Sequence, residues 1–171
     1  MKVLVTFFSQ SGNTEKIAKA VFEELSQAAE TQCKKLEDVS ANEVANYDCV
    51  FVGSPLHSGD LAQPVKDFLK EMKGKEGQKM AGFITHFAPA YPDQEMDAFT
   101  KPLKSACQEN GMDYVGSFDC QGYLNDALHK PVQEKLGLSD EQWAGMVKEM
   151  TGKPNEEDVA NAKAFVQSLL K

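Results

Sequence analysis

The stretch from Val3 to Thr14 constrains the fold of this chain most strongly. It opens with the run Val3–Phe8, in which Thr6 is the single polar side chain. An apolar run without alternation indicates a strand covered on both faces, as in a parallel sheet. The polar turn S-Q-S-G-N-T (Ser9–Thr14) follows, and apolar residues at helical spacing come directly after it, from Ile17 to Leu25. The sequence therefore predicts a buried strand, a hydroxyl-rich turn and a helix in succession.

A turn of this kind, between a strand and a helix, is suited to binding an anion. The first backbone N–H groups of a helix have no partner, its dipole favours negative charge, and the Ser and Thr hydroxyls add donors. The turn lacks both G-x-x-x-x-G-K-[ST] and G-x-G-x-x-G, which argues against a triphosphate cradle and against the usual dinucleotide fingerprint. It contains no cysteine, and the chain contains no arginine, which excludes a cysteine-dependent phosphatase. We expect neutral donors that hold a phosphate without attacking it; a simple helix cap would need only one such side chain.

Strand-like and helix-like segments alternate along the whole chain, which predicts a parallel sheet with helices on both faces. The expected strands are Lys2–Phe8, Thr31–Leu36, Cys49–Val52, Met80–Thr85 and Asp113–Cys120. The expected helices are Asn13–Ala29, a short one at Ser40–Asn46, one with Pro64 in its first turn, Asp93–Asn110 and Asn155–Leu170. Pro102 lies inside the fourth of these helices, so a kink or a late start is expected there. We predict a single domain over residues 1–171, a three-layer α/β/α sandwich with five parallel strands.

The segment Gln121–Lys153 exceeds what five strands and their helices require. It contains a capping-box-like start, Ser139-x-x-Gln142, ahead of Trp143 and several methionines. We predict two short helices that decorate the domain. Three roles stay open for them: an oligomer contact, a lid, or plain packing.

Composition narrows the functional class. A net charge of −8 argues against nucleic acid as a partner and favours a basic protein, although an acidic surface also serves solubility. No apolar run approaches the roughly 20 residues of a membrane span, and Met1-Lys2 leads straight into the first strand; we expect a cytoplasmic protein without membrane contact. The four cysteines have no metal-ligand spacing, so we expect reduced thiols and no metal site.

The motif [ST]-x-[ST]-G-x-T after the first strand resembles the phosphate loop of the flavodoxin family. Ser9, Gln10, Ser11, Gly12, Asn13 and Thr14 occupy its positions. The resemblance implies that these residues hold the phosphate of flavin mononucleotide (FMN). It also implies the sheet order 2-1-3-4-5, with the ligand beyond the carboxyl ends of the strands at the topological switch point.

The loop after the third strand, within G-S-P-L-H-S-G, is similar to a second flavodoxin segment. Its residues are Pro55, Leu56, His57, Ser58 and Gly59. The resemblance implies that its backbone lies against the isoalloxazine ring, and that a carbonyl here turns to accept a hydrogen bond from the ring N5–H of reduced flavin. Gly59 is the candidate for that change because glycine tolerates it at little steric cost. His57 could pack on the ring, line solvent, or tune the potential through its proton.

The loop after the fourth strand supplies the last candidates. They are Thr85, His86, Phe87, Ala88 and Tyr91. In flavodoxins an aromatic residue of this loop commonly covers the outer face of the ring. We expect Tyr91 to do so, since its apolar face and polar tip suit a partly wet site; Phe87 is the alternative.

Two functions remain from this reading. The first is an FMN-binding flavodoxin that carries electrons at low potential between redox proteins, with acidic residues around the loops that disfavour the last electron and attract a basic redox partner. The second is an FMN-dependent NAD(P)H:quinone-type oxidoreductase, usually oligomeric. A response-regulator receiver fails, because Ser9-Gln10 and Gly53-Ser54 stand where it needs carboxylates. We expect no catalytic acid or nucleophile, and a monomer, with a dimer as the alternative.

Overall fold

The computed structural model describes residues 1–170 of the chain. At its centre is a parallel sheet of five strands in the order β2-β1-β3-β5-β6, which is the predicted order 2-1-3-4-5. The strands are β1 (Lys2–Phe7), β2 (Glu30–Lys35), β3 (Cys49–His57), β5 (Lys79–His86) and β6 (Asp113–Gln121). A two-residue strand, β4 (Asp60–Leu61), folds back antiparallel on the end of β3. The predicted fold class is confirmed.

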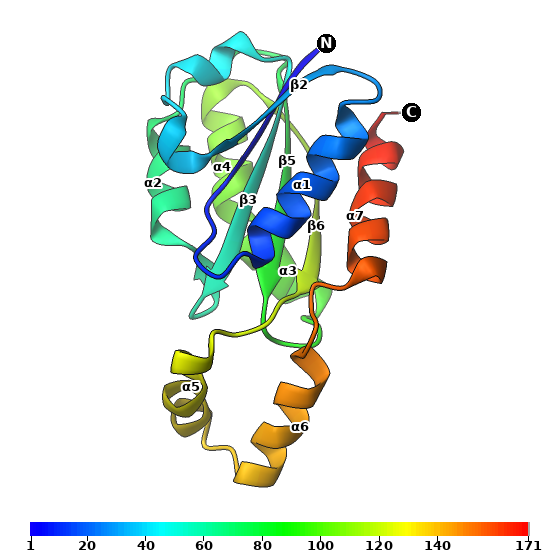
Figure 1. Cartoon of the computed structure of the whole chain (residues 1–171). Helices are drawn as coiled ribbons and strands as arrows, with labels where there is room; N and C mark the ends of the chain where they lie inside the picture. Colours follow the sequence, from blue (N-terminus) through cyan, green and yellow to red (C-terminus); the bar gives the residue numbers. More distant parts are fainter. Residues whose placement is uncertain (171) are drawn as a thin grey trace.

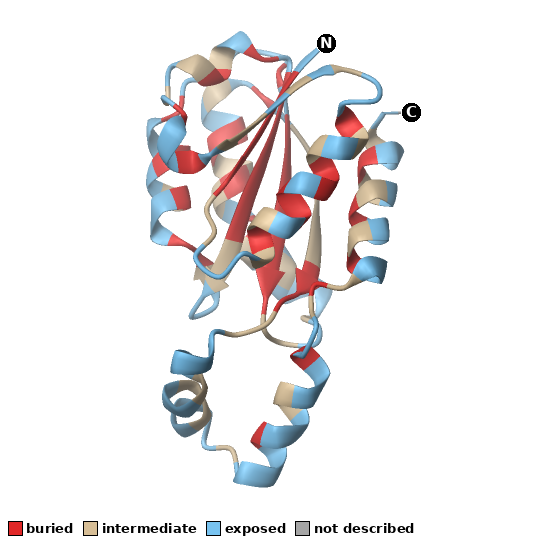
Figure 2. Cartoon of the chain, viewed as in Figure 1, coloured by how far each residue is buried: buried red, intermediate tan, exposed pale blue. Residues whose placement is uncertain are grey.

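Helices cover both faces of this sheet (Figure 1). On one face lie α1 (Asn13–Leu25) and α7 (Glu156–Leu169); on the other lie α2 (Gln63–Glu71) and α4 (Lys101–Asn110). Side chains of β1 alternate between the two layers: Val3 and Val5 pack on the α1–α7 side, and Leu4 packs on the α2–α4 side. The central strands are buried along most of their length (Figure 2), which is why β1 shows no alternation of polarity in the sequence.

Several predicted boundaries shift. The expected helix Asp93–Asn110 is two helices, α3 (Asp93–Phe99) and α4, which meet at Thr100. Pro102 sits in the first turn of α4, where a missing backbone N–H costs nothing. Strand β3 continues five residues beyond the prediction, because Gly53–Pro55 keep pairing with β5 before the chain turns into β4. Helix α1 stops at Leu25, four residues early, and the expected helix Ser40–Asn46 is a 3-10 turn at Glu43–Asn46.

The predicted decoration forms a separate pair of helices beyond the carboxyl end of the sheet (Figure 1). The 3-10 turn Asp126–Leu128 and the helices α5 (His129–Leu136) and α6 (Asp140–Met150) make up this helical extension, residues 121–153. The capping box is present at Ser139 and Gln142. Trp143 packs edge-on against His129, with ring centroids 5.4 Å apart. No helix within residues 1–170 is long and apolar enough to cross a membrane.

The cysteines are free thiols that differ in accessibility. Burial raises the pKa of Cys49 and of Cys107 to about 11, whereas Cys33, on the edge strand β2, is half-buried. Since the thiolate is the reactive form, we expect a disulfide reagent at pH 8 to modify Cys33 first, and the other thiols only after unfolding. Peptide mapping over time checks this. Early labelling of Cys120 on β6 would instead show that this edge of the sheet opens in the native protein.

Candidate cofactor site

A cavity of about 420 Å³ opens where β1, β3 and β5 end and the helical extension begins. Its lining residues come from four separate parts of the chain. They are Ser9, Gln10, Ser11, Asn13, Thr14, Pro55, Leu56, His57, Thr85, His86, Phe87, Gly122, Tyr123, Leu124, Asn125, Ala127 and Leu128. The strand register places the ends of β1, β3 and β5 side by side. The structure thus brings the three predicted loops to one opening, at the switch point of the sheet.

The turn after β1 forms the polar end of the cavity. Gly12 precedes α1 in the left-handed region (φ 89°), and no side chain caps the helix. The Gly12 N–H donates to Ser9 Oγ at 3.2 Å, and the first amides of α1 have no partner inside the helix. The buried hydroxyls of Thr14 and Thr85 lie 2.8 Å apart and link this turn to β5. The result is a cradle of neutral donors with space for an anion.

A contact with the residues directly after β6 holds this turn in place. The side-chain amide of Asn13 donates to the Tyr123 carbonyl at 2.8 Å, and the Gly122 N–H donates to the His86 carbonyl at 2.7 Å. A Cβ at Gly122 would lie 2.6 Å from Asn13 Nδ2. Glycine is therefore required where β6 passes the start of α1.

We expect Gly122→Ala to weaken cofactor binding by about fivefold, because the added methyl displaces the Asn13 amide and breaks one hydrogen bond, worth ~1 kcal/mol. Fluorescence titration of the apoprotein with FMN measures the change. Gly145→Ala is the matched control: Gly145 lies in α6 with nothing within 4 Å of an added Cβ. Equal affinities in the two variants would show that Asn13 does not depend on this close approach.

Apolar and aromatic residues also line the cavity. Leu56, Phe87 and Leu128 line it together with Tyr123. His57 stands edge-on to Phe8, with ring centroids 6.3 Å apart. No lysine, arginine, aspartate or glutamate is among the described residues that line the cavity. A phosphate at the neutral cradle and a flat ring against the aromatic residues match this donor set, so the residues present fit FMN.

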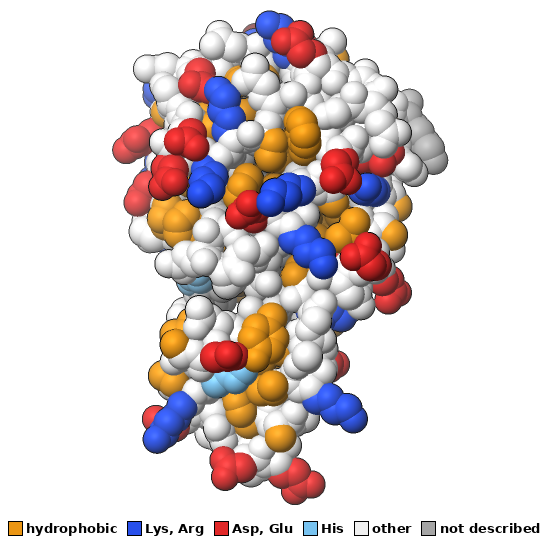
Figure 3. Space-filling model, in the orientation of Figure 1, with side chains coloured by type: hydrophobic (Ala, Val, Ile, Leu, Met, Phe, Trp, Pro, Cys, Tyr) orange, Lys and Arg blue, Asp and Glu red, His pale blue; other side chains and the backbone are white. Residues whose placement is uncertain are grey.

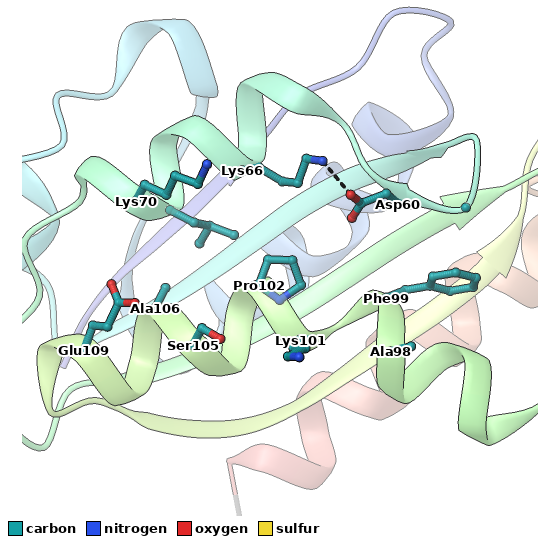
Figure 4. A pocket seen from close by; sticks show the side chains of 12 residues that line it. Asp60, Lys66, Lys70, Ala98, Phe99, Lys101, Pro102, Ser105, Ala106 and Glu109 are labelled. Carbon is teal, nitrogen blue, oxygen red and sulfur yellow. Dashed lines mark hydrogen bonds and ion pairs between the residues drawn. The ribbon is translucent and has the colours of Figure 1, made fainter.

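Some predicted site residues lie elsewhere. Ser58 and Gly59 form the turn between β3 and β4, both at positive φ. Gly59 lines a different cavity, about 560 Å³, between α2 and α4. Figure 4 shows this second cavity, with the Lys66–Asp60 ion pair at the β4 end and Glu109 and Lys70 at the other. Gly12 and Ala88 are also absent from the lining of the first cavity.

Tyr91 occupies a position that the sequence did not suggest. Its ring packs edge-on between His86 and Phe99, with centroid separations of 4.9 and 5.0 Å. It is not among the lining residues, whereas Phe87 and Tyr123 are. Tyr91 therefore packs against the His86 ring without lining the cavity, and Phe87 and Tyr123 are the aromatic residues that line it.

Sequence reasoning missed the contribution of the helical extension. Six lining residues come from Gly122 to Leu128, immediately after β6. One signal could have found them: β6 is the strand next to β5, so its carboxyl end must emerge at the same edge as the three predicted loops.

A doubly wound α/β sandwich with a neutral phosphate cradle at its switch point defines a mononucleotide-binding protein. The family profile for the flavodoxin domain matches residues 4–167. The chain belongs to the flavodoxin family, and this membership supports FMN as the cofactor of the cavity.

Individual relatives are similar to this chain over most of its length. An uncharacterized protein of Methanocaldococcus jannaschii is 29% identical over 172 residues, spanning 100% of this chain and 99% of that protein. An NAD(P)H dehydrogenase (quinone) of Methylocella silvestris is 27% identical over 154 residues, spanning 73% and 76%. The crystal structure of oxidised Flavodoxin 2 from Bacillus cereus superposes with a TM-score of 0.69 at 22% identity, covering 99% of this chain and 98% of the other. That last likeness concerns the fold.

Proposed function

We propose that this protein is a flavodoxin that carries electrons between redox proteins through one bound FMN. The observation that carries the proposal is the cavity itself, which combines a neutral phosphate cradle with aromatic lining residues. At about 420 Å³ it falls at the lower end of the range of about 300–1,000 Å³ for ligand sites. One mononucleotide suits it, and a nicotinamide donor would have to bind outside it.

The roles of the residues follow from their positions. FMN, when bound, supplies the electron-accepting ring. The turn Ser9–Thr14 binds its phosphate, while Leu56, Phe87 and Tyr123 exclude water around the ring. The protein thus contributes binding, orientation and electrostatics.

Acidic side chains on β4 and α3 support a basic partner. Asp60 and Asp97 pair with Lys66 and Lys104. Asp93 and Glu95, in the first turn of α3, take part in no ion pair among residues 1–170. Figure 3 shows acidic and basic side chains interspersed on the face that it displays, so the proposal rests on the α3 carboxylates. These two free carboxylates follow the loop that contributes Phe87, which places unpaired negative charge near the route by which electrons leave.

Electron transfer to a basic cytochrome c tests this docking surface. Because opposite charges steer association, the electron-transfer rate at low ionic strength should fall several-fold in the variant Asp93→Asn/Glu95→Gln. The rate of this variant should also depend less on salt concentration than the rate of the wild type. Glu23→Gln/Glu24→Gln, on α1, removes the same charge elsewhere and is the control. Equal losses in the two variants would point to a general effect of net charge.

An anaerobic reductive titration of the FMN-loaded protein tests the carrier function. A long-wavelength absorbance band that rises and then falls would mark two separate one-electron steps, as a carrier requires. Direct passage to the fully reduced spectrum would contradict the carrier proposal. Failure to bind FMN would overturn the cofactor site as well.

An FMN-dependent NAD(P)H:quinone oxidoreductase is the second candidate. Its support is the relative named as an NAD(P)H dehydrogenase (quinone) and the exposed apolar side chains of Leu128 and Leu136 on the helical extension, each 49% exposed. A second subunit placed there would complete a substrate pocket over the cavity. Rapid bleaching of the flavin by NAD(P)H, together with a dimeric mass by light scattering, would favour this candidate over the carrier.

A further inference from the structure

The side chain of His86 lies between two hydrogen-bond acceptors. Nδ1 is 2.8 Å from the Ala88 carbonyl oxygen, and Nε2 is 3.0 Å from Asp119 Oδ2. The imidazole side chain is 1% exposed, and the residue lines the cavity. We infer that His86 is an imidazolium that donates to both acceptors, and that its charge offsets that of Asp119 beside the cofactor cavity and so raises the potential of a bound FMN. The redox half of this inference rests on the proposed function.

The protonation state follows from the two acceptors. A carbonyl oxygen can only accept, so Nδ1 must donate to Ala88. A neutral ring would then turn the lone pair of Nε2 toward the Asp119 oxygen, leaving two buried or half-buried acceptors face to face. The Asp119 side chain is 38% exposed, so water stabilises its negative charge, and the shared proton belongs on the imidazole. Both ring nitrogens therefore donate.

Among residues 1–170, Asp119 is the one charged side chain that is hydrogen-bonded or ion-paired to the His86 ring. The edge of the Tyr91 ring contacts His86 from the loop, and burial, with Glu95 nearby, raises the pKa of the Tyr91 hydroxyl, which is neutral. Gln121, the β6 partner of His86, donates to the Phe87 carbonyl. Lys153, at the end of the helical extension, forms an ion pair with Asp158 on α7, and Lys153 Nζ is 3.2 Å from Asp158 Oδ2. Glu95 and Asp119 are thus the nearby acids, and His86 is the cation.

The charge of the pair then depends on one proton. With His86 protonated the pair is neutral overall; when the proton leaves, the pair carries −1. Nearby negative charge disfavours extra electrons on bound FMN, so a neutral pair gives a higher potential for complete reduction than an unpaired Asp119 would.

Nitrogen-15 NMR of the apoprotein tests the protonation state without any cofactor. The His86 resonances, assigned by their loss in His86→Gln, should show two protonated nitrogens at pH 7. In Asp119→Asn the amide N–H₂ can donate to Nε2, so the ring should become neutral with Nδ1 protonated. A neutral His86 in the wild type would overturn the inference.

Spectroelectrochemistry of the FMN-loaded proteins tests the redox role. His86→Gln leaves Asp119 unpaired, so its equilibrium constant for complete reduction should drop roughly tenfold at pH 7. Asp119→Asn keeps the site neutral, so its constant should stay within about threefold of the wild type. His129→Gln, a histidine outside the cavity lining that also lies near an aspartate, is the control.

Equal shifts in His86→Gln and Asp119→Asn would mean that the pair acts only through packing, and would overturn the redox role. If FMN does not bind at all, the proposed function fails together with that role. The NMR spectra still decide the protonation of His86 in that case, so the two failures are distinguishable.

Discussion

Gly12→Val is expected to weaken FMN binding by about 100-fold or more. Gly12 has φ 89° and ψ −8°, a conformation that costs a residue with a Cβ roughly 1–2 kcal/mol and a β-branched residue more. Relief of that strain turns the peptide, and the amides of the cradle then point away from the phosphate. Loss of one charge-assisted hydrogen bond adds about 1.5–3 kcal/mol, and ~2.7 kcal/mol corresponds to 100-fold. Equilibrium titration of the apoprotein with FMN measures the effect.

Gly77→Val is the control for strain alone. Gly77 also has positive φ (74°) and open space around an added Cβ, but it lies in the turn before β5, at the amino end of the strand. Both variants should lose similar stability in urea, and only Gly12→Val should lose the cofactor. Wild-type FMN affinity in Gly12→Val would remove the turn Ser9–Thr14 from the phosphate site.

Gly53→Val is expected to destabilise the fold by about 3 kcal/mol or more, the upper end of the cost of overpacking a core. Gly53 lies in β3, between β1 and β5, and a Cβ there would be 2.1 Å from Phe83 Cε2 and 2.9 Å from Phe7 Cβ. Neither neighbour can withdraw, because Phe83 is fully buried and Phe7 nearly so. Urea unfolding followed by circular dichroism measures the loss.

The double variant Gly53→Ala/Phe83→Leu isolates the cause. The smaller side chain at position 83 removes the two ring atoms nearest to the new methyl. The double variant should therefore be more stable than the sum of the single losses implies, by about 1 kcal/mol or more. Strict additivity would show that the glycine is needed for its backbone and not for the space it leaves.

The order of the elements could be predicted from local sequence patterns, and the sheet order from the resemblance to the flavodoxin family. Val3–Thr14 contains a strand, a turn and a helix start in twelve consecutive residues, and the structure retains all three. The buried stripe of α1, with Ile17, Val21 and Leu25, also follows from spacing alone. Patterns of period 2 and 3.6 report which side chains a segment buries.

Contacts between distant segments could not be predicted in this way. The Asn13–Tyr123 hydrogen bond joins residues 110 positions apart, and the His86–Asp119 pair depends on the register of β5 against β6. Tyr91 satisfied the general chemistry of a flavin-stacking residue, but Phe99 on α3 holds its ring against His86.

The base of the helical extension has an evolutionary consequence. Its two ends are joined by the hydrogen bond from the Tyr123 N–H to the Lys153 carbonyl, 3.1 Å long. The extension is therefore a loop that is closed at its base. Because the cost of closing a loop grows only slowly with its length, the residues between these two points can be lengthened, shortened or exchanged without disturbing β6 or α7. Related proteins could thus differ in the helices of the extension while the sheet and the helices on its two faces stay unchanged.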